Sequence, residues 1–130
     1  MTDQYIRELL AAYPGINEVW LIGSRAEGTA KADSDWDYLV FADRQILHSL
    51  RQRKQFNSSN VDLLVVHDGN GFKKPWRDGP RTKAGSLVHW EWHRRSETEA
   101  TYRATKFRDN DDFNRNISVG HALRIWPQPE

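Results

Sequence analysis

The chain is organised around the stretch Gly23-Ser-Arg-Ala-Glu-Gly-Thr-Ala-Lys-Ala-Asp-Ser-Asp-Trp-Asp37. It lies between two apolar runs, residues 19–22 and residues 38–42. A small Gly-Ser turn directly after a buried strand can place backbone N–H groups and a hydroxyl against a phosphate. Two carboxylates at positions i and i+2 of a strand point to the same face, where Mg²⁺ relieves their mutual repulsion. The stretch therefore indicates a protein that handles magnesium-bound nucleotide.

A third carboxylate, Asp62, lies within a later apolar run, residues 60–66. Burying an Asp among apolar neighbours is costly unless the carboxylate has a partner. We therefore expect Asp62 to join Asp35 and Asp37 from a neighbouring strand. For the pair alone, a solvated turn with Asp37 at a strand edge is an equally good interpretation, and Asp62 favours the functional one.

Length and composition restrict the class of protein. We expect the 130 residues to form a single domain with its own core. The absence of cysteine excludes disulfides, thiolate catalysis and Cys-type zinc sites. No apolar run approaches the ~20 residues that span a bilayer, and residues 1–5 do not resemble a secretory signal. We therefore expect no membrane partner and a cytoplasmic location.

Apolar spacing predicts the secondary structure of the first half. Amphipathic spacing predicts two helices, one that Pro14-Gly15 ends and one over about 44–56. Apolar runs predict three strands, over residues 18–22, 36–42 and 61–66. The last of these is nearly all aliphatic, which is typical of a strand buried on both faces.

The second half has weaker patterns. Residues 67–85 are polar and rich in turn residues, which predicts a loop. Alternation over 86–93 and 100–107 predicts a β-hairpin that turns near residues 95–97, with Trp90 and Trp92 more often core residues than a stacking surface. Residues 113–126 fit either a short helix or a strand.

The order of the motifs resembles the DNA polymerase beta-like nucleotidyltransferase superfamily, in particular its minimal nucleotidyltransferase type. The matching residues are Gly23-Ser-Arg-Ala-Glu-Gly28, Ser34-Asp-Trp-Asp37 and Asp62. The resemblance covers about 17–66 and implies an α/β fold, with a mixed β-sheet and flanking helices. We expect residues 1–130 to form a single domain in which residues 67–130, with the C-terminal hairpin, extend this core. Trp36 replaces a usual aliphatic residue, and we expect it to point away from the carboxylates.

The resemblance also implies the roles of the site residues. Gly23 and Ser24 would hold the nucleotide triphosphate, and Arg25 is a further candidate because it lies in the same loop. Asp35 and Asp37 would bind magnesium, and Asp62 would assist the metal or act as base on the acceptor hydroxyl. Lys73, Lys74, Arg77, Arg81 and Lys83 are interpreted mainly as a solvated loop, with a phosphate- or acceptor-contacting role for some of them as the alternative.

The implied activity is transfer of a nucleotidyl group from a magnesium-bound NTP, with ATP favoured, to an acceptor hydroxyl, with release of pyrophosphate. The sequence does not identify the acceptor, and the small size of the chain suggests a partner protein or a homo-oligomer. The alternative is an antitoxin-like or regulatory binding module that binds nucleotide or a partner protein without turnover. A nucleic-acid partner has weaker support, because the net charge is only +1.

Overall fold

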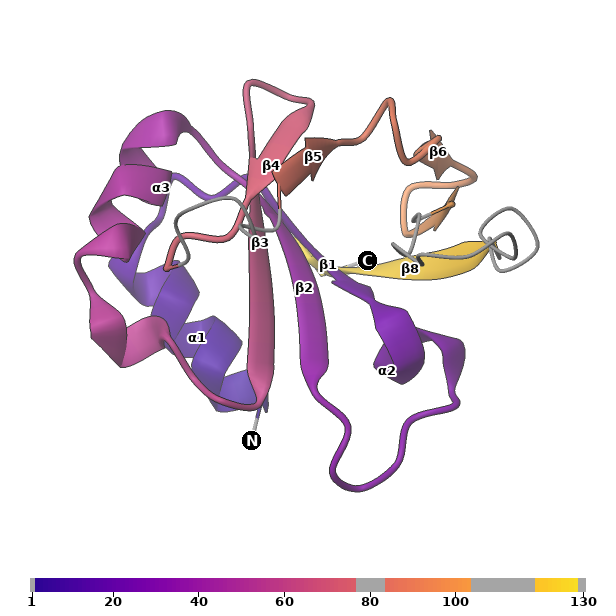
Figure 1. Cartoon of the computed structure of the whole chain (residues 1–130), viewed down its shortest axis with the longest axis horizontal. Coiled ribbons are helices and arrows are strands. Elements are labelled where there is room, and N and C mark those ends of the chain that lie inside the picture. Colours follow the sequence, from indigo (N-terminus) through magenta and orange to yellow (C-terminus); the bar gives the residue numbers. More distant parts are fainter. Residues whose placement is uncertain (1, 77–83, 104–118, 129–130) are drawn as a thin grey trace, which may run out of the picture.

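The computed structural model describes residues 2–76, 84–103 and 119–128 (Figure 1). These residues form an eight-stranded sheet in the order β5-β4-β3-β2-β1-β8-β7-β6. The strands are β1 (Glu18–Ile22), β2 (Trp36–Phe41), β3 (Val61–His67), β4 (Gly71–Lys73), β5 (Ala84–Ser86), β6 (His93–Arg94), β7 (Glu99–Tyr102) and β8 (Gly120–Trp126). Only β2 and β3 pair in parallel among these strands, so the sheet is mixed and the fold class is α/β, as expected.

Two helices, α1 (Thr2–Ala12) and α3 (Arg44–Arg51), cover one face of the central strands (Figure 1). Leu9 and Leu50 of these helices are fully buried against Tyr38 and other residues of the sheet. Asp43 caps α3 by accepting a hydrogen bond from the backbone N–H of Ile46 at 2.9 Å. None of the described helices is long and apolar enough to cross a membrane.

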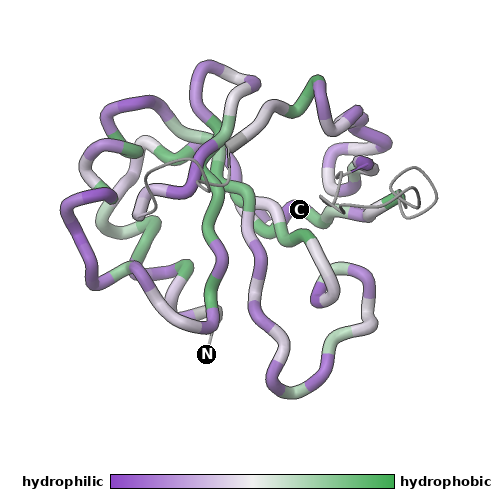
Figure 2. Tube along the Cα trace, in the orientation of Figure 1, coloured by the Kyte–Doolittle hydropathy of each residue, from purple (hydrophilic) through white to green (hydrophobic). Residues whose placement is uncertain are grey.

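A second core lies on the opposite face of the sheet. Leu64 of β3 belongs to this core while Leu63 belongs to the helix-side core, which confirms that β3 is buried on both faces. Trp90 lies between the two ends of the sheet, because its ring is 4.6 Å from that of Phe72 in β4 and 5.3 Å from that of Tyr102 in β7. In Figure 2 the apolar residues concentrate along the central strands. The sheet therefore curls around a core that the segment between β5 and β6 helps to fill.

The predicted hairpin is confirmed only near its turn. Strands β6 and β7 pair antiparallel on either side of residues 95–98, but residues 87–91 form a turn instead of the predicted strand. The backbone N–H of Trp90 donates to the carbonyl of Ser86, and the N–H of Trp92 donates to that of Leu87. The turn buries Leu87 and Trp90, three residues apart, and leaves Val88 exposed. Strand-like alternation was therefore misleading here.

Other predicted boundaries also differ from the structure. The loop predicted over 67–85 contains β4 and β5, each only three residues long and thus too short for a periodic pattern. Helix α3 ends at Arg51, and a 3-10 helix, Lys54–Phe56, buries Phe56 after it. The ambiguous segment 113–126 contains β8, whereas the predicted strand end at 104–107 and residues 113–118 lie outside the described residues.

Candidate functional site

The parallel pairing of β2 and β3 brings two of the expected carboxylates together. Asp37 lies directly beside Asp62 in the register, and Ile22 of β1 lies on the other side of Asp37. Both carboxylates share the face of Leu39 and Leu64, because alternate residues of a strand point to the same side. Asp37 and Asp62 therefore lie on the same face of the sheet as the second core, at the end of the sheet where β1 ends and the Gly-Ser loop begins.

Gly23 is fixed by its contact with Asp37. Its φ angle is +73°, and a Cβ built at this position would overlap the Oδ2 atom of Asp37. No residue with a side chain fits this place without displacing the carboxylate or straining the backbone. The chain then turns into a short helix, α2 (Gly23–Glu27), whose second residue is Ser24. The predicted loop thus lies against the predicted carboxylate.

Arg25 has contacts that the sequence did not indicate. Its guanidinium donates to the carbonyl of Ser34 at 2.9 Å and to that of Ala32 at 3.3 Å. It also lies over the ring of Trp36, 4.3 Å from the ring centroid. Trp36 packs against the helix-side core, so it points away from the Asp face as predicted. Arg25 therefore stabilises the conformation of the loop that precedes Asp35.

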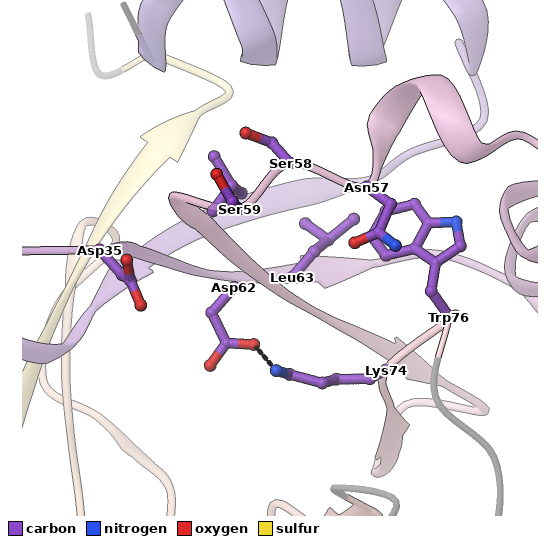
Figure 3. A pocket seen from close by; sticks show the side chains of 9 residues that line it. Asp35, Asn57, Ser58, Ser59, Asp62, Leu63, Lys74 and Trp76 are labelled. Carbon is purple, nitrogen blue, oxygen red and sulfur yellow. Dashed lines mark ion pairs between the residues drawn. The ribbon is translucent and has the colours of Figure 1, made fainter.

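Asp35 and Asp62 line a hollow of about 290 Å³ (Figure 3). The other lining residues are Asn57, Ser58, Ser59, Val61, Leu63, Lys74 and Trp76. Figure 3 shows the Lys74 side chain reaching Asp62, where Nζ lies 2.5 Å from Oδ1. The wall of the hollow is therefore polar and includes acidic side chains, Asp35 and Asp62, and a basic one, Lys74.

Two side chains from the second half complete this region. Lys74 follows β4 and is paired with Asp62, so it is not part of a solvated loop. Three further predicted loop cations, Arg77, Arg81 and Lys83, lie outside the described residues. The hydroxyl of Tyr102, in β7, accepts a hydrogen bond from the backbone N–H of Gly23 at 3.1 Å. No local pattern indicates a contact between residues 79 positions apart.

The environment of Tyr102 keeps its hydroxyl protonated. Burial raises the pKa of Tyr102, and the negative charges of Glu27 and Asp37 raise it further. The hydrogen bond from Gly23 lowers the pKa, but the net shift is upward. At neutral pH the side chain is therefore an uncharged phenol that can still donate a proton.

The carboxylates suit magnesium only in part. Within the described residues, no group of three or more His, Asp and Glu side chains is arranged to hold a metal ion. Mg²⁺ is commonly held by one or two carboxylates together with substrate phosphates. Asp35 and Asp37 have the donor chemistry that such a site uses, and Asp62 is paired with Lys74. The number of carboxylates therefore suits a site of that kind.

The first part of the chain matches a known protein family. The family model described as "Polymerase beta, Nucleotidyltransferase" matches residues 4–53. No curated protein matches the chain. One solved structure, "Crystal structure of the toxin-antitoxin with AMP-PNP", is 30% identical over a match that covers 50% of this chain and 57% of that chain, with a TM-score of 0.36.

The matched family segment includes the Gly23 turn, Arg25 and the pair Asp35 and Asp37, while Asp62 lies beyond it. The expected resemblance is therefore confirmed: residues 4–53 of this chain are similar to the polymerase beta nucleotidyltransferases.

Proposed function

We propose that the protein transfers a nucleotidyl group from an NTP to an acceptor hydroxyl and releases pyrophosphate. The observation that supports this most is the register of the sheet, which sets Asp37 beside Asp62 while Gly23 lies against the Asp37 carboxylate. A phosphate-holding turn and two acidic side chains then lie at one end of three adjacent strands. This arrangement suits in-line displacement at a phosphate, because such chemistry depends on positioning and charge neutralisation.

In this proposal Gly23 and Ser24 contact the triphosphate, and Asp35 and Asp37 hold Mg²⁺. When bound, the ion neutralises phosphate charge and helps to orient the reacting phosphoryl group. Arg25 has an indirect role, since its guanidinium donates hydrogen bonds to the carbonyls of Ala32 and Ser34. It keeps the loop before Asp35 in place.

Asp62 and the hollow in front of it belong to the acceptor side. Asp62 accepts the proton of the acceptor hydroxyl as the acceptor oxygen bonds to the α-phosphorus, and the bond from that phosphorus to the bridging oxygen breaks. Lys74 compensates the negative charge of Asp62 before the acceptor arrives. Ser58 and Ser59 offer hydroxyls to a polar acceptor at the wall of the hollow.

The test is transfer of label from NTPs labelled at the α-phosphate. The protein is incubated with each NTP, Mg²⁺ and a cell extract that contains small molecules, proteins and RNA, and the labelled product class is then separated. Asp35→Asn and Asp37→Asn should each abolish labelling. Asp33→Asn is the matched control, because Asp33 is an exposed carboxylate of the same loop. Labelling by either site variant at the wild-type rate would contradict the mechanism.

A second candidate is the regulatory binding module, which an apolar groove of about 700 Å³ favours. The groove lies where α1 meets β1 and β8, and its lining includes Leu10, Leu21 and the exposed Trp126. Arg7 and Arg124 are the charged residues of the lining, so an acidic protein partner would suit it. If this function is the correct one, Arg124→Glu should abolish formation of the partner complex, while Asp35→Asn/Asp37→Asn should leave it intact.

A further inference from the structure

The hydroxyl of Tyr102 lies at the centre of the candidate site although its strand lies outside the family segment. It accepts the N–H of Gly23 at 3.1 Å, and the carboxylates of Asp37 and Glu27 are close enough to raise its pKa. A neutral phenol has one proton to donate as well as lone pairs to accept with. In its hydrogen bond with Gly23 the hydroxyl uses a lone pair, so its proton can be directed at a ligand. The site therefore contains a hydrogen-bond donor beside the Gly23 turn.

The ring of Tyr102 is held so that the hydroxyl cannot turn away. On one side it stacks on Trp90 with an interplanar angle of 21° and a centroid distance of 5.3 Å. On the other side it fills the space above Gly120, its register partner in β8, where a Cβ would lie 2.5 Å from Cζ. Tyr102 is only 7% exposed. Packing of this kind fixes the position of a polar group in advance of binding.

We propose that Tyr102 is a nucleotide-binding residue, whose hydroxyl donates its proton to a phosphate oxygen of the bound nucleotide while it accepts the N–H of Gly23. The inference rests on the proposed function, since it needs a phosphate at the Gly23 turn. It gives the hairpin β6–β7, which is outside the family segment, a direct part in the site. A hydrogen bond from the hydroxyl to a charged phosphate oxygen is among the stronger kinds in proteins, and it would add to the contacts of the Gly23 turn.

The experiment compares the affinity of two single-atom variants for Mg-AMP-PNP by calorimetry. Tyr102→Phe keeps the ring and its packing and removes only the hydroxyl. Tyr5→Phe is the matched control, because the hydroxyl of Tyr5 is also partly buried and donates to the carbonyl of Phe56 at 2.8 Å, on the helix side of the sheet. We expect Tyr102→Phe to raise the Kd about tenfold or more, as for a hydrogen bond to a charged group, and Tyr5→Phe to leave it unchanged.

A second measurement uses the unaltered protein. Because the Gly23 amide bonds to the same hydroxyl, its NMR resonance should shift when Mg-AMP-PNP binds to the wild type. An unchanged Kd in Tyr102→Phe would overturn the inference, because the hydroxyl would then contribute nothing to binding. Tighter binding by Tyr102→Phe would also overturn it, because the hydroxyl would then compete with the phosphate. If the wild type does not bind Mg-AMP-PNP, the proposed function fails, and the inference fails with it.

Discussion

Replacement of Gly23 by alanine tests how the turn at Gly23 is built, and Gly28 in the same loop is its control. Both glycines have a positive φ angle, +73° at Gly23 and +77° at Gly28. Alanine in this conformation is strained by about 1–2 kcal/mol at either position. A Cβ at Gly28 meets no atom within 4 Å, whereas a Cβ at Gly23 overlaps Oδ2 of Asp37. The two variants thus differ in the contact with Asp37.

The extra contact sets the expected difference in stability. If the Asp37 side chain leaves its rotamer to make room, the additional cost is about 0.5–1.5 kcal/mol. Gly23→Ala should therefore lower the free energy of unfolding by about 1.5–3.5 kcal/mol, and Gly28→Ala by about 1–2 kcal/mol. Because Asp37 is displaced only in Gly23→Ala, this variant alone should weaken Mg-AMP-PNP binding, by about tenfold or more, equivalent to at least about 1.4 kcal/mol.

Urea unfolding followed by circular dichroism measures the first quantity, and calorimetric titration with Mg-AMP-PNP measures the second. The comparison is made at a temperature where both variants are folded. Equal losses of stability and affinity in Gly23→Ala and Gly28→Ala would refute the contact between Gly23 and Asp37. Full affinity in Gly23→Ala would refute the role of that contact in binding.

Two further changes test the surroundings of the site. Lys74→Met removes a cation that lies 2.5 Å from the carboxylate of Asp62, and it should lower the free energy of unfolding by about 1–3 kcal/mol in urea titrations. Lys73→Met is the control, and an equal effect would show that the pair is unimportant. Burial raises the pKa values of Tyr5 and Tyr102, so the folded state holds these protons more tightly. The contribution of these two groups to stability should therefore be constant below the unfolded pKa of about 10 and fall at higher pH. Tyr5→Phe should make this fall shallower in urea titrations at increasing pH, and an unchanged fall would contradict the assignment.

Local sequence patterns were sufficient for the first half of the site. The apolar runs before and after the Gly-Ser loop are consecutive strands, and the next run pairs with the second of them. With these three strands adjacent, the register of β2 and β3 sets Asp37 beside Asp62. The prediction that Trp36 points away from Asp37 follows from strand alternation alone, and the structure confirms it.

The second half was less predictable because its contacts are long-range and its strands are short. β4 and β5 have three residues each, which gives no period to detect. The alternation around Trp90 was misleading because the turn buries Leu87 and Trp90, three residues apart, and leaves Val88 exposed. Tyr102 contacts Gly23 because β8 lies between β7 and β1 in the sheet, and nothing near residue 102 in the sequence indicates that strand order.

The most direct test of the central claim is the magnesium dependence of nucleotide binding, because it does not require the acceptor. Non-hydrolysable analogues of the four NTPs are titrated into the wild type and into the double variant Asp35→Asn/Asp37→Asn, with and without Mg²⁺. Circular dichroism and thermal unfolding establish that the double variant is folded. The proposed site predicts binding by the wild type that requires Mg²⁺ and is lost in the double variant. Absence of binding to all four analogues, or equal binding by the double variant, would contradict it.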